Sequence, residues 1–325
     1  MYKSNLLTKG FVDEKIPDGI NIVSEIKKLC KEKNAIIMAH YYQPDEIQDI
    51  ADFIGDSLAL AQQATKTNAD IIVLCGVHFM GETAKILSAQ KKVLVPDLNA
   101  GCSLADSCPA DKFEEFIKQY PGYTVISYVN TTAAVKALTD VCVTSTNAKK
   151  IIDQFPNDAK LIFGPDKNLG DYINSSTGKK MVLWNGACHV HEQFSLEKIL
   201  ELKKQYPKAL VLAHPECKKT VLTIADYIGS TQALLNFASE SDKTQFIIAT
   251  ESGIIHEMRK KNPAKEFIPA PPLDSTCACN ECNFMRLNTL EKLYNCLKFE
   301  LPEILIEEEL RKKAERSILR MLEMS

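Results

Sequence analysis

Three cysteines lie close together near the C-terminal end of the chain, in the stretch DSTCACNECNFM: Cys277, Cys279 and Cys282. Clustered thiols can ligate a metal, form a redox pair or contribute one part of a larger site. The chain has 11 cysteines in all. Its first residues, MYKSNLLTKGFVDEK, lack the apolar run of a secretory signal, so we expect a cytoplasmic protein. Disulfides are disfavoured in that compartment, and thiol clusters there indicate metal binding or catalysis.

Other side chains that can do chemistry recur at regular intervals. Imidazole and phenol groups, which can act as acids or bases, follow three similar apolar runs at His40, Tyr128 and His214, which are 88 and 86 residues apart. Hydroxyl groups, which can bind anions, recur 17, 17 and 16 residues later at Ser57, Ser145 and Ser230. Spacing this regular over three copies indicates an internal repeat.

Each copy of the repeat has the pattern of an α/β unit. The runs IIMA, VISYV and LVLA are short and rich in Ile and Val, as in strands buried on both faces. Each is followed by a helical pattern and then by a second apolar run, IIVLCG, KLIFG or FIIAT. This alternation predicts parallel sheets, with functional side chains at the carboxyl ends of the strands. We therefore predict an α/β fold of three pseudo-threefold-related αβα units, with parallel sheets around a central cluster site.

The repeat divides the chain into three expected units: 1–103, 104–190 and 191–285. The remaining segment, 286–325, has the pattern of two helices broken at Pro302. We expect these helices to pack back onto the first unit.

Each unit supplies one cysteine after its last expected strand. Cys102, Cys188 and Cys282 stand 62, 60 and 68 residues after the leading His or Tyr of their units. Three thiolates from equivalent places would converge on the pseudo-threefold axis. Such a set suits a [4Fe–4S] cluster with one open iron, which acts as a Lewis acid.

Two other interpretations stay open. A zinc-stabilised binding module of three α/β repeats would need the thiols of DSTCACNECNFM together with a histidine, for which His189 and His191 are candidates. A hydro-lyase would use an open-iron cluster on a different hydroxyacid.

Several of these residues also have an ordinary structural interpretation. Serine and threonine at a helix start often serve as N-caps, which applies to Ser57, Ser145, Ser230 and Thr231. Four cysteines in apolar surroundings are expected to pack as small hydrophobes: Cys30, Cys75, Cys142 and Cys296.

The order of motifs along nearly the whole chain resembles that of the quinolinate synthase family. The motifs run from AHYYQPDEIQDIADFIGDS through GCSLAD, YVNTTAAVKALTDVCVTSTNA, GACHVHE, AHPEC, GST, ATESGIIHEM and CNECNFM to RSILRML. The resemblance implies a transferase of pyridine-nucleotide (NAD) biosynthesis that condenses iminoaspartate with dihydroxyacetone phosphate to quinolinate, phosphate and water. It also implies a [4Fe–4S] cluster with three Cys ligands and one open iron, and a transient supply of iminoaspartate by an L-aspartate oxidase.

The resemblance also assigns residues. It places the cluster ligands at Cys102, Cys188 and Cys282. It implies catalytic roles for His40, Tyr42, Tyr128, His191, His214 and Glu216. It implies substrate contacts at His40, Ser57, Tyr128, Val129, Asn130, Ser145, His214, Pro215, Glu216, Ser230 and Thr231. One departure is Asn283, where the family usually has Pro. Under oxidation Cys279 could form a disulfide with Cys282, and no role is expected for Cys277.

Composition excludes two classes of partner. The 39 Lys+Arg stand against 42 Asp+Glu and are dispersed, so no basic surface for nucleic acid is expected. The longest apolar runs, such as ALVLA at 209–213, are too short to cross a bilayer. We therefore expect small-molecule substrates, with neither nucleic acid nor membrane as a partner.

Overall fold

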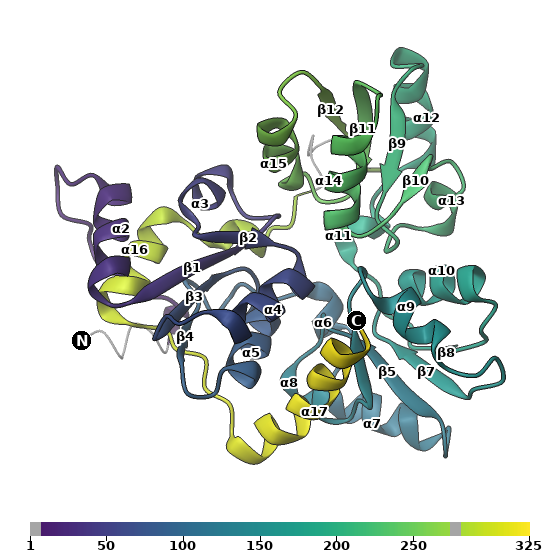
Figure 1. Ribbon diagram of the computed structural model, residues 1–325, viewed down its shortest axis with the longest axis horizontal. Helices are drawn as coiled ribbons and strands as arrows, with labels where there is room; N and C mark the ends of the chain where they lie inside the picture. The colour runs from purple at the N-terminus through teal and green to yellow at the C-terminus, as the bar shows by residue number, and fades with distance from the viewer. Residues whose placement is uncertain (1–7, 274–280) are drawn as a thin grey trace.

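Three α/β units surround a common centre in the computed structural model, which describes residues 8–273 and 281–325 (Figure 1). Each unit contains a four-stranded sheet, and every strand pair within the sheets is parallel. The strand order is the same in all three sheets: second, first, third, fourth. The predicted α/β fold of three repeated units with parallel sheets is therefore confirmed.

The sheet of the first unit is covered on both faces. Ile72 and Leu74 of β3 belong to a core shared with α4 and α5, whereas Ile71 and Val73 face a second core that includes residues of α2 and α16. This alternation arises because successive side chains of a strand point to opposite faces. The elements are α2 (Ile22–Glu32), β1 (Ala35–His40), α3 (Asp45–Ile50), β2 (Phe53–Gly55), α4 (Ser57–Lys66), β3 (Ile71–Cys75), α5 (His78–Leu87), β4 (Lys92–Leu94) and α6 (Ser103–Asp106).

The second unit repeats this order. Asp166 caps α10, because its side chain accepts a hydrogen bond from the backbone N–H of Leu169. Gly178 ends the same helix in the left-handed conformation, at a φ of 73°, which glycine adopts without strain. The elements are α7 (Ala110–Lys118), β5 (Thr124–Tyr128), α8 (Ala133–Ala137), β6 (Val141–Val143), α9 (Ala148–Asp153), β7 (Leu161–Gly164), α10 (Lys167–Thr177), β8 (Val182–Leu183) and α11 (His189–Glu192).

The third unit has the same plan. Ser230 caps α14, and its hydroxyl oxygen accepts a hydrogen bond from the N–H of Ala233. The elements are α12 (Leu196–Gln205), β9 (Leu210–Ala213), α13 (Lys219–Leu222), β10 (Tyr227–Ile228), α14 (Thr231–Glu240), β11 (Gln245–Ala249), α15 (Ile254–Lys261) and β12 (Glu266–Pro269).

The sheet registers show which hydroxyl residues are equivalent. His40 pairs with the last residue of β2 and Tyr128 with the last residue of β6, while His214 follows the pairing of β9 with β10 by one residue. The residues opposite His40, Tyr128 and His214 in this register are Gly55, Val143 and Gly229. Two residues after them along the chain are Ser57, Ser145 and Thr231. The third hydroxyl of the repeat is therefore Thr231, and the alignment on Ser230 was wrong by one residue.

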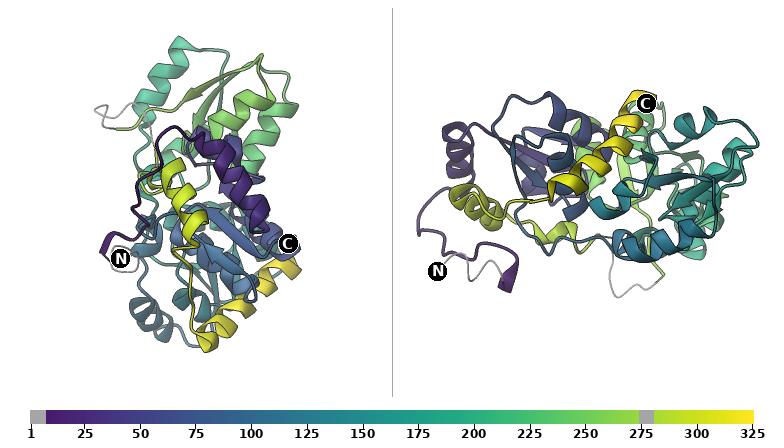
Figure 2. Two further views of the ribbon diagram at one scale, coloured as in Figure 1. Left: turned by 90° about the vertical axis from the view of Figure 1, so that its left-hand side faces the viewer. Right: turned by 90° about the horizontal axis from the view of Figure 1, so that it is seen from below.

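The C-terminal segment contains η1 (Met285–Leu287), α16 (Leu290–Phe299) and α17 (Glu308–Met324), with Pro302 between the two α-helices as predicted. Helix α16 lies against α2 of the first unit (Figure 2). Helix α17 instead lies against α8 and β6 of the second unit and also contacts α5 of the first. The segment was expected to pack on the first unit, but α17 joins the first unit to the second. The unit boundaries themselves stay a prediction.

Among the helices of the described residues, α17 is the longest at 17 residues, and its sequence is rich in charge. None of these helices combines the length and the apolar character that crossing a membrane requires.

Candidate active site

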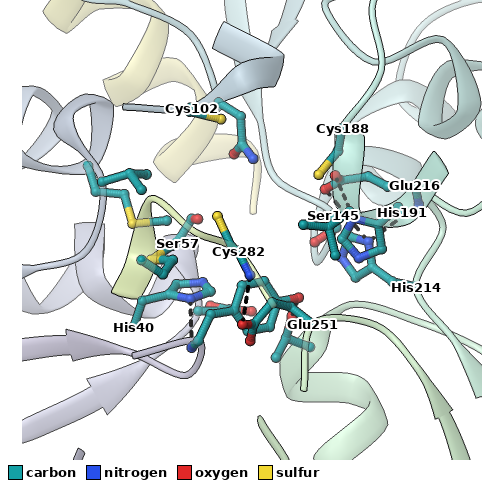
Figure 3. Close-up of a pocket in the computed structure, with 18 of the residues that line it drawn as sticks. His40, Ser57, Cys102, Ser145, Cys188, His191, His214, Glu216, Glu251 and Cys282 are labelled. Atoms are coloured by element: carbon teal, nitrogen blue, oxygen red, sulfur yellow. Dashed lines mark hydrogen bonds and ion pairs between the residues drawn. The ribbon is translucent and has the colours of Figure 1, made fainter. Parts of the chain in front are cut away.

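A pocket opens at the centre of the molecule, where the carboxyl ends of strands from all three sheets approach one another (Figure 3). Its empty volume is about 630 Å³, a figure that includes the open mouth. Thirteen residues singled out from the sequence line it: His40, Tyr42, Ser57, Cys102, Tyr128, Asn130, Ser145, Cys188, His191, His214, Glu216, Thr231 and Cys282.

Three further residues expected to contact substrate do not line this pocket. Val129 and Pro215 are buried beside it. Ser230 is buried as well, and its hydroxyl caps α14. For Ser230 the plain capping interpretation therefore describes what the side chain does.

The three cysteines of the repeat face a common space (Figure 3). Cys102 is the N-cap residue of α6, Cys188 is that of α11, and Cys282 precedes η1. Each sulfur accepts at least one backbone N–H hydrogen bond from the turn that follows it. Such donors are the usual environment of a metal-bound thiolate.

Burial controls the protonation of these thiols. It raises the pKa of Cys102 to about 12, and it also raises the pKa of Cys188 and Cys282. The proximity of Cys282 raises the pKa of Cys102 further, and that of Cys102 raises the pKa of Cys188. Three thiolates so placed require compensating positive charge, which a bound metal centre supplies.

A second metal-binding arrangement overlaps the first. The sulfur of Cys188, a ring nitrogen of His191 and a carboxylate oxygen of Glu216 lie within 4.8 Å of one another and could hold a metal ion. The zinc alternative also involves Cys277 and Cys279, which lie outside the described residues.

Glu216 is the carboxylate at the centre of the polar groups. The phenol of Tyr128 donates a hydrogen bond to its Oε1 at 2.6 Å, and Nδ1 of His191 lies 3.2 Å from its Oε2. Burial alone would raise the pKa of Glu216, but the imidazoles of His191 and His214 and the hydrogen bonds from His191 and Tyr128 lower it to about 2. Glu216 is therefore ionised at neutral pH.

His40 and His214 have equivalent surroundings in the first and third units. Nδ1 of His40 accepts the backbone N–H of Tyr42 at 3.2 Å, and Nδ1 of His214 accepts that of Glu216 at 3.3 Å. This pattern places the ring hydrogen on Nε2. Burial lowers the pKa of both imidazoles to about 3. Both rings are therefore neutral near pH 7 and can donate a hydrogen bond from Nε2.

A series of polar contacts links Glu216 to the first unit, beginning with the 3.2 Å contact between its Oε2 and Nδ1 of His191. Nε2 of His191 lies 3.0 Å from the hydroxyl of Thr250, which lies 2.8 Å from the phenol oxygen of Tyr42. The same phenol oxygen lies 2.7 Å from the hydroxyl of Thr231. Glu216 and Tyr42 are thus connected through His191 and Thr250.

Sequence reasoning missed three buried residues of this region: Asp166, Thr250 and Glu251. Thr250 and Glu251 directly follow β11, in the motif ATESGIIHEM, and Asp166 lies two residues after β7. The signal is the end of the third strand in each unit, which places polar residues at the same edge of the sheet as His40 and His214.

The fold and this pocket define a pseudo-threefold α/β protein whose three units share one central site of thiols, imidazoles and a buried carboxylate. The sequence profile of the family described as quinolinate synthetase A protein matches residues 24–323. The quinolinate synthase of Thermosynechococcus vestitus is 59% identical over 309 residues, which cover 95% of this chain and 97% of that protein. That of Chloroherpeton thalassium is 57% identical over 306 residues, which cover 94% and 95%. The chain therefore belongs to the quinolinate synthetase A protein family, and the family resemblance noted in the motifs is confirmed.

Proposed function

We propose that this protein condenses iminoaspartate with dihydroxyacetone phosphate to form quinolinate, with release of phosphate and water. The observation that carries the proposal is the convergence of one cysteine from each unit on a single pocket that also holds Glu216 and its imidazole neighbours. The names of the relatives point to the same product.

The residues that would hold the cofactor are Cys102, Cys188 and Cys282, as ligands of a [4Fe–4S] cluster. The donor set fits, because each cysteine lines the pocket and its sulfur already accepts at least one backbone N–H hydrogen bond. When bound, such a cluster supplies an open iron that polarises an oxygen atom of the substrate. An exposed cluster of this kind favours the reducing cytoplasm as the compartment.

Substrate anions would bind at the helix starts that reach the pocket. Ser57 and Thr231 are the first residues of α4 and α14, where free backbone N–H groups and the helix dipole favour carboxylate or phosphate. Ser145 does not begin a helix, since α9 starts at Ala148; its hydroxyl hydrogen-bonds the phenol of Tyr128 instead. Oδ1 of Asn130 is buried without a partner among the described residues, and it would accept a hydrogen bond from a substrate N–H or O–H.

Proton transfer falls to Glu216 and the groups bonded to it. The ionised carboxylate can accept a proton from a substrate carbon or nitrogen, and the phenol of Tyr128 can return one to a leaving hydroxyl. His191, Thr250 and Tyr42 can pass that proton along the pocket. The Nε2–H groups of neutral His40 and His214 can stabilise negative charge that develops on a substrate oxygen.

The substrates themselves suggest one partner. An imine hydrolyses in water, so iminoaspartate must be used soon after it forms. A transient supply from an L-aspartate oxidase would meet this requirement.

A product assay tests the proposed function. Protein loaded with iron and sulfide in the absence of oxygen is incubated with dihydroxyacetone phosphate and iminoaspartate generated from oxaloacetate and ammonia. We expect quinolinate and phosphate in equal amounts. Water loss from a simple hydroxyacid without any quinolinate would instead support the hydro-lyase, and a colourless zinc protein would support the binding module.

A further inference from the structure

Two buried carboxyl groups occupy equivalent places in the second and third units. Asp166 stands two residues after the end of β7, and Glu251 stands two residues after the end of β11. The two strands hold the same position in their sheets, next to the first strand of the unit. Asp166 is 0% exposed and Glu251 is 1% exposed, so both side chains need partners inside the protein.

Asp166 joins the start of a helix to a cysteine loop. Its Oδ1 accepts the backbone N–H of Leu169 at 2.7 Å, which caps α10. Its Oδ2 accepts the backbone N–H of Cys188 at 3.2 Å. The side chain thus fixes the backbone of Cys188 relative to the end of β7.

Glu251 makes the corresponding contacts in the third unit. Its Oε2 accepts the backbone N–H of Gly253 at 2.7 Å, and its Oε1 accepts the backbone N–H of Cys282 at 3.1 Å. Nη2 of Arg286 also lies 3.1 Å from Oε1. Glu251 is one methylene longer than Asp166. Its unit is also the one with the longest spacing to the cysteine, because Cys282 stands 68 residues after His214.

The first unit differs at this position. Val77 stands two residues after the end of β3, and its side chain has no hydrogen-bond acceptor. The Cys102 loop is nevertheless attached, because the N–H of His78 donates to the carbonyl of Ala100 at 2.6 Å. Lys167 and Gly186 make the same backbone contact in the second unit, at 2.8 Å. A contact from a buried carboxyl group to the cysteine backbone is thus found at Cys188 and Cys282 but not at Cys102.

We propose that Asp166 and Glu251 are positioning residues that hold Cys188 and Cys282 in the geometry needed to ligate the cluster. The inference rests on the cofactor proposed above. Each carboxyl group ties the cysteine backbone to a strand end before any metal binds, so the loop need not become ordered on binding. Partners of this kind around metal ligands affect metal affinity by about 10- to 100-fold.

Amide substitutions test the inference with little change in shape. Asp166→Asn and Glu251→Gln each keep one oxygen and replace the other with an NH₂ group, which cannot accept the second N–H. In anaerobically loaded protein we expect iron to pass to a chelator at least about tenfold faster from either variant than from the unsubstituted protein.

Matched controls are available in the same two units. Asp140 accepts the N–H of Val125, and Asp226 accepts the N–H of Val211, both at 2.8 Å and both at the start of a strand. Asp140→Ala and Asp226→Ala therefore lose a similar side-chain-to-backbone bond at the opposite ends of the strands from the cysteines. We expect their iron release to match that of the unsubstituted protein.

A second measurement does not need the cluster. In metal-free protein, Asp166→Asn should speed alkylation of Cys188 by iodoacetamide, and Glu251→Gln should speed that of Cys282, with Cys102 unchanged in both variants. Peptide mass spectrometry separates the three sites. Unchanged iron release and unchanged alkylation would overturn the inference. If the unsubstituted protein failed to take up iron, the proposed cofactor would fall, and the alkylation rates alone would decide the role of the carboxyl groups.

Discussion

Glu216 is the residue on which polar contacts from different parts of the molecule converge. Tyr128 of the second unit donates to it, and the rings of His191 and His214 lie within 3.6 Å of its oxygens. These neighbours keep a fully buried carboxyl group ionised. A buried base of this kind is what repeated proton transfer to and from a substrate requires.

Glu216→Gln separates the base role from a ligand role. We expect iron and sulfide content to stay at the level of the unsubstituted protein, because the proposed cluster would take its ligands from cysteines, while turnover falls at least about 100-fold with the loss of the base. Tyr128→Phe should likewise keep its iron and sulfide content and lose turnover. Loss of bound metal from Glu216→Gln would show that Glu216 acts as a ligand together with Cys188 and His191.

The buried histidines predict a pH dependence of stability. The pKa of His40 and of His214 is lowered from 6.5 to about 3 by burial, so below pH 6.5 the unfolded chain binds protons that the folded protein does not. Stability therefore falls as the pH falls, by up to about 1.4 kcal/mol per pH unit for each histidine. The lowered pKa of Glu216 acts in a more acidic window, because the stability it contributes is present above pH 4.5 and is lost as the pH falls through about 2.

Urea unfolding of the metal-free protein between pH 7 and pH 5 measures this dependence. We expect His40→Asn to have a shallower slope of unfolding free energy against pH than the unsubstituted protein. Equal slopes would mean that His40 is not held neutral in the fold.

At the residue scale, the prediction from sequence fails where matching the copies by residue type disagrees with matching them by position in the sheet. The repeat located His40, Tyr128 and His214 because their strands end at the same level in each sheet. It selected Ser230 over Thr231 because the copies were matched by residue type, and both carry a hydroxyl. Asp166 and Glu251 escaped notice because the equivalent residue in the first unit is Val77, so the three copies share a position but not a side chain.

Helix α14 gives a test at the scale of elements. Ser230 caps the helix, whereas Thr231 directs its hydroxyl to Tyr42. Ser230→Ala should lower the unfolding free energy by about 1 kcal/mol and leave the substrate Michaelis constants unchanged. Thr231→Val should keep stability and raise the Michaelis constant of an anionic substrate. A raised Michaelis constant for Ser230→Ala together with lost stability for Thr231→Val would instead support Ser230 as the hydroxyl of the repeat.

Helix α17 shows what an amphipathic pattern leaves undecided. The C-terminal segment carries an apolar stripe that predicts a buried face, formed by Ile304, Leu305, Leu310, Ile318, Leu319 and Leu322. Ile304 and Ile318 are buried, but Leu305 and Leu319 are exposed. The stripe does not say which surface it covers, because any apolar groove would serve. In the structure that surface is formed mainly by α8 and β6, so the helix connects two units.

Neighbouring substitutions in α17 test this packing. Ile318→Ala should lower the unfolding free energy by about 3 kcal/mol, because it leaves a cavity between the units. Leu319→Ala, at a side chain that is 43% exposed, should cost less than about 0.5 kcal/mol. Chemical denaturation measures both, and equal losses would contradict the assignment of the buried face.

At the scale of the whole molecule, the site exists only where the three units meet. Each unit provides one thiol, and no unit alone lines the pocket. The pocket therefore requires all three units, and having them in one chain brings their strand ends together. The copies also differ, as at Tyr128, which stands in place of a histidine, and such differences would supply the different groups that the two proposed substrates require.

The most direct test of this account is the rate of quinolinate formation measured against bound iron in anaerobic protein. We predict a rate that rises in proportion to iron up to the full complement of one [4Fe–4S] cluster per chain. Cys102→Ala, Cys188→Ala and Cys282→Ala should each hold no cluster and form no quinolinate, while Cys277→Ala and Cys279→Ala should keep both. A rate independent of iron, or no quinolinate from fully loaded protein, would contradict the account.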